Sequence, residues 1–493
     1  MRLSPAVTTA GAITPATAET HSAVVVFLGD RAYKLKKPVD LGFLDFTTRE
    51  ARREACRREF ELNRRLAPDV YLGVVDVADE AGEPCEHVLV MRRMPPERRL
   101  TTLIRGGVDV TEDVRAIARR VGEFHLEAEA VDDPGAYAGA AAVRANWEDN
   151  LATLRRFPQV IEEAERERVG ALAGRYLGGR GALLQERIEA GRVRDGHGDL
   201  LADDIFCLDD GPRILDCLDF APRYRCGDVL LDAAFLAMDL ERQGMPGLAH
   251  SFLDWWAEVT GDRYPASLAH HYIAYRAHVR AKVACLRAEQ GLTGAADTAR
   301  HLHALSARHL EAGRVRLVLV GGAPGTGKST LARGLAQATG WTLLRSDEVR
   351  KELAGMGHLD DAAAPHAEGL YRPEAVAATY RELTRRAQAL LAAGEPVVLD
   401  ATWSTAAHRE EASRAAEATS SDLIALRCEL PAQVAEQRLL ARGADASDAT
   451  VEVARQLAAT ADPWPEATAV DTAPPPEEVV TMALEAVGLT DGE

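Results

Sequence analysis

The chain has 493 residues, of which 47% are hydrophobic, and it carries a formal net charge of −18. This length exceeds what one hydrophobic core usually supports, so we expect two or three domains. The acidic balance argues against nucleic-acid binding through a broad basic surface. No stretch predicts a membrane span or a secretory signal, and the seven cysteines form no CxxC pair, so we expect a cytoplasmic protein.

The chain begins with an Ala/Thr-rich segment, residues 1–21, which we expect to be disordered. Regular structure is predicted to start in the sequence that follows. Apolar runs at residues 24–28 and 32–35 flank Gly29-Asp30, a dipeptide typical of tight turns. These runs predict a β-hairpin.

A helix is predicted next, because Thr47 and Glu50 have the spacing of a capping box at the start of an amphipathic segment. Strand-like segments follow at residues 71–78 and 87–94. We therefore predict a small mixed lobe over residues 22–100. Beyond it, residues 101–312 have a helical pattern, interrupted by two short apolar runs joined by an Asp-Asp-Gly-Pro turn.

The helical region contains a motif with chemical meaning. In RDGHGDLLADDIFC, His197-Gly198-Asp199 is followed after four residues by Asp204. This has the form HGDxxxxN with Asp in the place of Asn, and it resembles the catalytic loop of the aminoglycoside phosphotransferase family, relatives of the protein kinases. The resemblance covers roughly residues 22–310. It implies that Asp199 accepts the proton of a substrate hydroxyl and that Asp204 binds Mg²⁺.

A second carboxylate that this resemblance implies follows in ILDCLDF. Asp216 ends the second of the two short runs and matches the metal-binding Asp of the family. Asp219 is the alternative, because the spacing to the next matching segment is longer than usual in the family. In that segment, RCGDVLLDAAFLAMDL, Asp228 and Asp232 match the structural acids of a family helix.

The small lobe supplies further residues to the same resemblance. Lys34 and Lys36 lie on one face of a predicted strand, and Glu59 lies on the following helix, as in the lysine–glutamate pair of kinases. We prefer Lys34 over Lys36, although lysines that protect an edge strand show the same pattern. The segment from Met91 to Met94 resembles the connection between kinase lobes, which implies that its backbone contacts adenine.

From residue 313 to 493 strands and helices alternate, which predicts an α/β domain with a doubly wound parallel sheet. GxxxxGK[ST] occurs between the first strand and the first helix, where backbone N–H groups can surround phosphates. Lys328 would reach the β- and γ-phosphates, and Ser329 would bind Mg²⁺. The predicted nucleotide-binding residues are Gly322, Ala323, Pro324, Gly325, Thr326, Gly327, Lys328, Ser329 and Thr330.

Other polar residues of this half fit phosphoryl transfer. Asp400 ends an apolar strand, where it would hold the Mg²⁺ water shell or cap the next helix. Asp347 would accept a substrate proton, or only complement a helix dipole, and Arg350 would hold a substrate anion. Arg438 and Arg442 are spaced i,i+4, which suits a lid over phosphates or a solvated basic face.

The second half resembles the small P-loop kinases, a group that includes gluconate kinase, polynucleotide 5′-kinase and zeta-toxin-like enzymes and is also described as an AAA-type ATP-binding domain. The resemblance covers roughly residues 315–488. It implies an active site that uses Mg·ATP. Ring-forming AAA ATPases match poorly, because the sequence leaves no room for their helical lid subdomain.

We therefore predict an α+β protein-kinase-like bilobal domain followed by an α/β P-loop kinase domain, an order that resembles bifunctional aminoglycoside phosphotransferase/ATP-binding proteins. Each domain is expected to transfer phosphate from ATP, with Mg²⁺, to a hydroxyl of a sugar, amino sugar or aminoglycoside-like molecule. Alternatively, the first half is an inactive kinase-like sensing module that regulates the second, or the second is an ATPase switch without an acceptor. No feature predicts the oligomeric state.

Overall fold

The structure is a computed structural model that describes residues 16–20, 22–40, 45–357, 372–441 and 451–489. The chain divides into two compact units. Unit 1 comprises Met1–Ala138 and Arg187–Arg263, and unit 2 comprises Gly139–Glu186 and Tyr264–Glu493. Within the described ranges, no helix is both long enough and apolar enough to cross a membrane.

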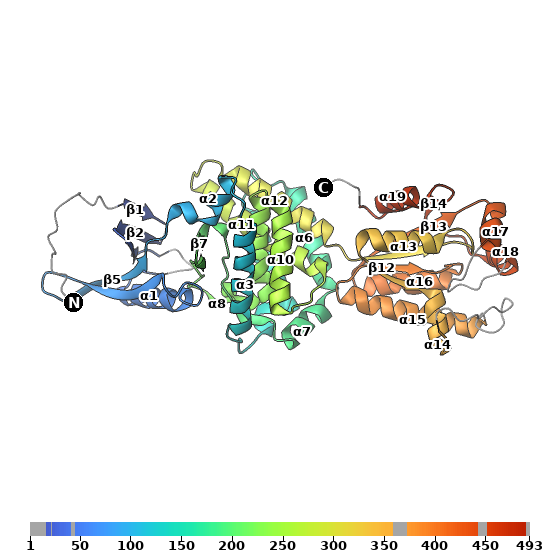
Figure 1. The fold of residues 1–493 in the computed structure, drawn as a ribbon, viewed down its shortest axis with the longest axis horizontal. Coiled ribbons are helices and arrows are strands. Elements are labelled where there is room, and N and C mark those ends of the chain that lie inside the picture. The colour runs from blue at the N-terminus through green and yellow to red at the C-terminus, as the bar shows by residue number, and fades with distance from the viewer. Residues whose placement is uncertain (1–15, 21, 41–44, 358–371, 442–450, 490–493) are drawn as a thin grey trace. The chain divides into compact units, whose positions relative to one another are not determined.

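Unit 1 contains a five-stranded antiparallel sheet in the order β1-β2-β3-β5-β4, drawn at the blue end of the ribbon in Figure 1. The hairpin expected around Gly29-Asp30 is confirmed, and Gly29 has φ of 61° in its turn. The expected disordered segment reached residue 21, but residues 16–19 form β1 and pair with β2. The strands are β1 (Ala16–Glu19), β2 (Ala23–Leu28), β3 (Arg31–Lys36), β4 (Tyr71–Ala78) and β5 (Pro84–Arg92).

Helix α1 (Arg49–Asn63) follows the hairpin, one residue away from the predicted start. Its N-cap is Thr48, whose Oγ1 accepts a hydrogen bond from the backbone of Ala51 (3.1 Å). The predicted capping box at Thr47 is wrong, because the Asp45 carboxylate accepts hydrogen bonds from the amide and hydroxyl of Thr47 instead. Among the residues that α1 buries are the polar Glu59 and Asn63, so this helix contributes functional groups as well as packing.

The rest of unit 1 is mainly helical, and α3 packs against α10, which also contacts α9. The two short runs predicted around the Asp-Asp-Gly-Pro turn are confirmed as the antiparallel hairpin β7–β8. The elements are η1 (Pro96–Arg98), α2 (Leu100–Arg105), α3 (Thr111–Glu127), α4 (Gly135–Ala138), β6 (Val193–Asp195), η2 (Ala202–Asp204), β7 (Ile205–Leu208), β8 (Gly211–Ile214), α8 (Pro222–Arg225), β9 (Cys226–Asp228), α9 (Val229–Arg242) and α10 (Pro246–Thr260).

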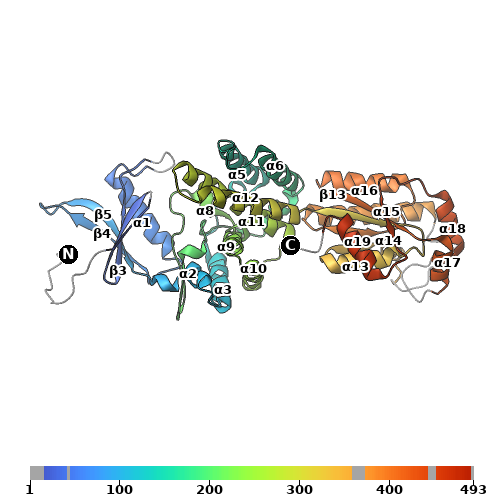
Figure 2. The ribbon, with the colours of Figure 1, turned by 90° about the horizontal axis from the view of Figure 1, so that it is seen from above.

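Unit 2 contains the predicted parallel sheet, with strand order β11-β12-β10-β13-β14. Helices α13 and α19 cover one face, and α15 and α16 cover the other (Figures 1 and 2). This doubly wound arrangement confirms the fold class expected for the second half. The elements are β10 (Arg316–Gly321), α13 (Lys328–Thr339), β11 (Thr342–Arg345), α14 (Ser346–Leu353), α15 (Pro373–Ala392), β12 (Val397–Asp400), α16 (Ala406–Ala418), β13 (Asp422–Glu429), α17 (Ala432–Leu440), α18 (Val451–Thr460), β14 (Thr468–Asp471) and α19 (Pro476–Ala486).

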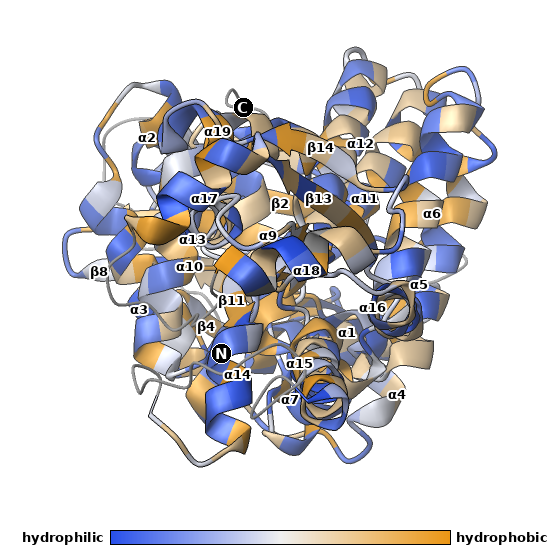
Figure 3. Ribbon diagram, turned by 90° about the vertical axis from the view of Figure 1, so that its right-hand side faces the viewer, coloured by the Kyte–Doolittle hydropathy of each residue, from blue (hydrophilic) through white to orange (hydrophobic). Residues whose placement is uncertain are grey.

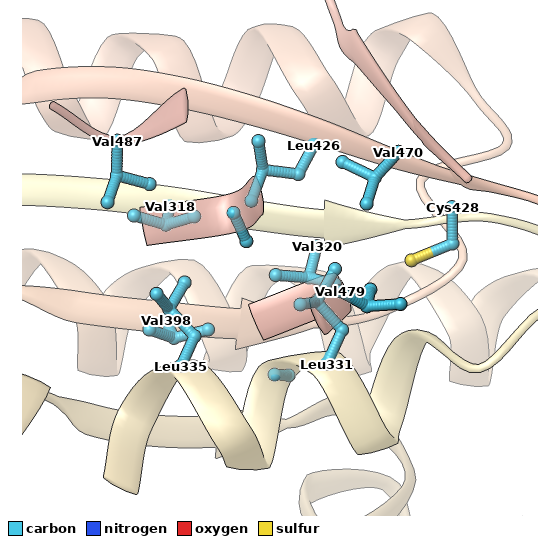
Figure 4. Packing of buried hydrophobic residues seen from close by; sticks show 12 residues of the cluster. Val318, Val320, Leu331, Leu335, Val398, Leu426, Cys428, Val470, Val479 and Val487 are labelled. Atoms are coloured by element: carbon cyan, nitrogen blue, oxygen red, sulfur yellow. The ribbon is translucent and has the colours of Figure 1, made fainter. Parts of the chain in front are cut away.

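The core on the α13/α19 face is aliphatic. Val318 and Val320 of β10 face Leu331 and Leu335 of α13, and all four are buried (Figure 4). Full burial of such a side chain contributes about 1.5–3 kcal/mol, so this layer fixes the start of α13 beneath the sheet edge. At the surface, hydrophilic and hydrophobic residues alternate along α17 and α18, as expected for helices with one solvated face (Figure 3).

Unit 2 also includes five helices that precede the parallel sheet in sequence, so this compact unit begins well before residue 313. Arg180 is 1% exposed and donates to the carbonyl of Thr419 (2.9 Å). Ser267 Oγ donates to the carbonyl of Gly394 (2.7 Å). These bonds fix helices to the loops of the sheet domain. The helices are α5 (Ala140–Leu154), α6 (Glu163–Gly178), α7 (Gly181–Glu189, which crosses the unit boundary), α11 (Ala266–Glu289) and α12 (Ala295–Ala312).

Candidate phosphotransfer sites

In unit 1, one glutamate joins both candidate lysines. Glu59 Oε1 lies 2.7 Å from Lys34 Nζ, and Glu59 Oε2 lies 2.7 Å from Lys36 Nζ. Lys34 Nζ also lies 3.1 Å from Asp216 Oδ1, whereas Lys36 Nζ lies 3.0 Å from Asp219 Oδ2. The structure therefore brings all five predicted residues together, as two parallel lysine–aspartate pairs that share Glu59.

The two pairs differ in electrostatics. Burial alone would lower the pKa of Lys34, but Asp216 and Glu59 outweigh it and hold that pKa well above its usual value. Lys34 in turn lowers the pKa of Asp216, whose side chain is 56% exposed. Burial raises the pKa of Asp219, whose side chain is only 15% exposed. Asp216 is thus the carboxylate that stays charged and open to a cation, which supports the preference for Lys34 and Asp216.

The His-Gly-Asp loop is held by a buried acid. The Asp232 carboxylate accepts hydrogen bonds from the backbone N–H groups of His197 (2.6 Å) and Gly198 (2.8 Å). His125 Nε2 lies 3.1 Å from the same carboxylate, and Trp256 Nε1 donates to His125 Nδ1 (2.9 Å). Asp232 therefore lies where the resemblance expected a structural acid. The His125–Trp256 support is a long-range contact that the sequence reasoning missed.

The His197 ring connects this loop to the metal-site strand. Its Nε2 lies 3.2 Å from the carbonyl of Leu215, and its Nδ1 accepts a long hydrogen bond from the backbone of Asp199 (3.4 Å). Burial lowers the pKa of His197 to about 4, so the ring is neutral at pH 7 with its proton on Nε2. Because Leu215 precedes Asp216, this ring fixes Asp199 relative to Asp216.

Asp204 and Asp216 are the predicted Mg²⁺ ligands of this site, and Asp199 adds a third negative charge near them. Burial, together with the nearby charges of Asp216 and Asp199, raises the pKa of Asp204 well above its usual value. A cation bound there would relieve this repulsion. In the described part of the chain no three His, Cys, Asp or Glu side chains form a ready metal site. Mg²⁺ usually takes one or two carboxylates and completes its shell with phosphate oxygens and water, so Asp204 and Asp216 remain the predicted ligands.

Met91 and Met94 lie at the end of β5 and just after it. Both side chains pack against a buried cluster that includes Tyr71, Phe206 and Leu215. The connecting segment is therefore fixed against the β7–β8 hairpin. Contact of its backbone with adenine remains a prediction, and Tyr71 and Phe206 were not singled out from the sequence.

In unit 2, the predicted phosphate loop lies between β10 and α13, as expected. Gly322, Gly325 and Gly327 have φ of 137°, 87° and 88°, a region that disfavours side chains. Lys328 is the first residue of α13 and is 8% exposed. The loop therefore presents backbone N–H groups and one lysine at a helix N-terminus, which fits the phosphates of a nucleotide.

This loop is held by residues that lie far from it in sequence but next to it in space. Thr472 Oγ1 donates to the carbonyl of Thr326 (2.6 Å), and Arg438 Nη2 donates to the carbonyl of Thr472 (3.1 Å). Arg438, Lys328 and Ser329 line a cavity of about 290 Å³. Arg438 thus lies beside the phosphate loop, as predicted, whereas Arg442 lies outside the described residues. Thr472 was missed because it is 146 residues from its partner.

Asp400 ends β12 and is 3% exposed. Its Oδ2 accepts a hydrogen bond from Arg345 Nε (3.2 Å). Its Oδ1 is buried and has no hydrogen-bond partner among the described residues. A water molecule of a Mg²⁺ shell would satisfy this oxygen, so Asp400 and Ser329 fit the ion. The sequence reasoning did not identify Arg345.

Asp347 and Arg350 both lie on α14, where Arg350 Nη2 is 2.5 Å from Asp347 Oδ1. A cavity of about 840 Å³ lies beside the phosphate loop, and Ala323, Trp403 and Trp464 are among its lining residues. Neither Asp347 nor Arg350 lines this cavity. The structure thus joins the predicted base and the predicted anion holder to each other, and neither lines this 840 Å³ cavity.

Trp403 has φ of 52°, which is unusual for a bulky residue, and its side chain is 1% exposed. The ring of Tyr380 contacts it edge-on at 5.2 Å, and the Tyr380 hydroxyl accepts a hydrogen bond from the Trp403 backbone (3.2 Å). Strained backbone of this kind gathers at functional sites. Trp403 is therefore a residue of interest that the sequence reasoning missed.

The two sites define a chain that combines a protein-kinase-like bilobal part with a P-loop part. A family model described as "AAA domain" matches residues 317–464. The chain is 44% identical over 470 residues, 94% of each chain, to the uncharacterized protein Rv2004c of Mycobacterium tuberculosis. It therefore belongs to the same family as that mycobacterial protein.

Solved structures resemble each part separately. A gluconokinase from Sinorhizobium meliloti is 22% identical, covering 36% of this chain and 92% of its own, with a TM-score of 0.25. A choline kinase from Cryptosporidium parvum is 11% identical, covering 61% and 89%, with a TM-score of 0.41. An aminoglycoside 2′-phosphotransferase-IIIa in complex with GDP is 14% identical, covering 59% and 91%, with a TM-score of 0.38. These likenesses concern the fold.

Proposed function

We propose that this protein is an ATP-dependent small-molecule kinase with two phosphotransfer sites, one in each unit. The observation that carries the proposal is that each unit gathers the side chains and backbone groups that phosphate transfer would need. Unit 1 places Lys34, Glu59 and Asp216 in one ion network. Unit 2 places Lys328 at a helix N-terminus behind a loop of glycines with positive φ. The free thiols of all seven cysteines suit the cytoplasm, where we propose that the protein acts.

In unit 1, Lys34 would orient the α- and β-phosphates, and Asp216 and Asp204 would hold Mg²⁺, which neutralises charge on the transferring phosphoryl group. Asp199 would accept the proton of the acceptor hydroxyl as its oxygen bonds to the γ-phosphorus and the bond to the β-phosphate oxygen breaks. The neutral His197 ring positions Asp199, because it bonds to the Asp199 backbone and to Leu215.

In unit 2, the backbone N–H groups of residues 322–330 and Lys328 would bind the β- and γ-phosphates, and Ser329 and Asp400 would hold Mg²⁺ and its water. We assign proton acceptance to Asp347 and phosphate stabilisation to Arg438, which lies beside the loop. The acceptor is a small hydroxyl compound of the sugar or amino sugar class.

The test is ADP release by the full chain with a panel of sugars, amino sugars and aminoglycosides. Lys328→Ala should remove the turnover of unit 2, Asp216→Ala should remove that of unit 1, and the double variant should be inactive. An acceptor whose turnover survives both changes would contradict the assignment. If Asp216→Ala leaves all turnover intact, unit 1 is a sensing module and only unit 2 is an enzyme.

A further inference from the structure

Another cavity in unit 2 lies at the opposite end of the sheet from the phosphate loop. Its volume is about 770 Å³. It lies where β10 and β13 begin, at Arg316 and Asp422, and α6, α12 and the residues after α19 complete its lining. The phosphate loop follows the other end of β10, after Gly321. This opening, which we name the arginine cavity, is therefore separate from the proposed phosphotransfer sites.

The arginine cavity is strongly basic within an acidic chain. Among the described lining residues, five arginines stand against two carboxylates, an excess of three positive charges, although the whole chain carries −18. Cations gathered in this way repel one another, and a bound anion would reduce that repulsion. The charged lining residues are Arg168, Arg175, Arg308, Arg314, Arg316, Glu311 and Asp422.

The two carboxylates are already shared among three of the arginines. Glu311 Oε1 lies 2.8 Å from Arg168 Nη2, and Glu311 Oε2 lies 3.0 Å from Arg314 Nη1. Asp422 Oδ1 lies 2.6 Å from Arg175 Nη2, and Asp422 Oδ2 lies 2.6 Å from Arg314 Nε. All four carboxylate oxygens therefore have a guanidinium partner.

Arg316 is 5% exposed and forms no direct ion pair with a carboxylate among the described residues, although Asp422 and Glu311 are near enough to act on its charge. Its Nη1 donates to the carbonyl of Arg314 (3.2 Å), and its guanidinium lies 5.8 Å from the centre of the Trp341 ring. Burial and the nearby Arg314 lower its pKa, and the opposing effect of Asp422 and Glu311 does not offset them. Both carboxylates are already bonded to other arginines, so an anionic ligand would stabilise Arg316 further.

The remaining wall of the arginine cavity is apolar. Leu423, Ile424, Val487 and Leu489 line it, and Val487 is buried while Leu423 is 40% exposed. The volume is within the range of small-molecule sites. Because guanidinium groups match the paired oxygens of phosphates, the ligand that fits both walls carries a phosphate and an apolar group. We propose that the arginine cavity binds a small phosphorylated ligand with an apolar moiety, at a site distinct from both phosphotransfer sites.

The test is calorimetric titration of the full chain with inorganic phosphate and with phenyl phosphate. Saturating Mg²⁺ and a non-hydrolysable ATP analogue are present to occupy nucleotide sites. One saturable site is expected, with phenyl phosphate bound more tightly than inorganic phosphate. Arg316→Gln should weaken binding about tenfold, as expected for loss of a charge-assisted hydrogen bond. Arg308→Gln, a change at an exposed position, should weaken it about threefold without affecting folding.

The matched control is Arg300→Gln. Arg300 lies on α12 like Arg308, pairs with Asp297 at the surface and does not line the cavity. Its substitution should leave both affinities unchanged. Absence of saturable binding, equal affinity in Arg316→Gln, Arg308→Gln and wild type, or an equal loss in Arg300→Gln would each overturn the proposal. Because the readout is binding and not turnover, failure here leaves the proposed kinase activity untouched.

Discussion

Lys36→Met should destabilise the protein more than Lys34→Met does, whereas Lys34→Met should lower catalysis more. Both lysines contact Glu59, so either change leaves this buried carboxylate with one partner. Removing one member of a buried ion pair costs about 3–5 kcal/mol. Lys36 is 5% exposed, and its loss should cost about 3 kcal/mol; Lys34 is 17% exposed and partly screened, and its loss should cost about 2 kcal/mol.

The loss of catalysis should depend instead on which aspartate each lysine contacts. Lys34 contacts Asp216, the more exposed and more readily charged carboxylate, whereas Lys36 contacts the buried Asp219. Loss of one charged donor at a transferring phosphate lowers the rate about 10²–10³-fold. Lys34→Met should therefore lower phosphotransfer by unit 1 by about 100-fold. Lys36→Met should lower it by less than about threefold, because it changes the charge near Lys34 but leaves the Lys34–Asp216 contact in place.

Both variants are best made in the Lys328→Ala chain, so that only unit 1 contributes turnover. Local stability is measured by hydrogen exchange of the α1 amides, because a chain with two units has no single unfolding free energy. Lys34→Arg should recover part of the activity. If Lys36→Met costs more turnover than Lys34→Met, the preference for Lys34 and Asp216 is wrong.

Four further outcomes are expected. In the otherwise intact chain, Lys328→Ala should remove the turnover of unit 2, because this side chain is the cation at the start of α13; unchanged ADP release in an Asp216→Ala background would contradict this. Asp347→Asn should lower kcat of unit 2 at least tenfold with little change in analogue affinity; equal loss of both indicates a structural role. Asp199→Asn should lower kcat of unit 1 by about 10²–10⁴ and preserve Mg²⁺-dependent analogue binding, measured by calorimetry. Burial lowers the pKa of His278 to about 3, so stability falls as pH drops from about 6.5 towards 3; His278→Phe should flatten this fall in thermal denaturation, and exposed His301→Gln should not.

The sequence predicted those features of the fold and of the sites that are formed by residues close together in the chain. The phosphate loop was predictable because its glycines, its lysine and its flanking strand and helix are contiguous. The hairpin at Gly29-Asp30 was predictable for the same reason. Alternation along a strand placed Lys34 and Lys36 on one face, and the pairing with Glu59 came from the resemblance to kinases. Thr48 replaced Thr47 as the helix cap because Asp45 engages Thr47, a competition that the capping-box spacing does not reveal.

The missed contacts are those between residues far apart in sequence. Arg345 bonds to Asp400 and Thr472 bonds to Thr326 only because parallel strands bring their carboxyl ends to one edge of the sheet. The compact unit that includes α5, α6, α11 and α12 was likewise hidden. An amphipathic helix shows that it has an apolar face, but its sequence does not identify the surface that covers that face.

The two phosphate sites rely on different physical means, and this predicts different sensitivities. As proposed, unit 2 would bind phosphate through backbone N–H groups, whose geometry the glycines fix and whose charge does not change with pH. No GxGxxG precedes Lys34, so unit 1 would depend on side chains instead. Burial and neighbouring carboxylates raise the pKa of Asp204, and an ion bound there must displace a proton when Asp204 is protonated. Nucleotide binding by unit 1 should consequently require more Mg²⁺ as the pH falls, and measuring analogue affinity against Mg²⁺ concentration at several pH values in the Lys328→Ala chain would test this.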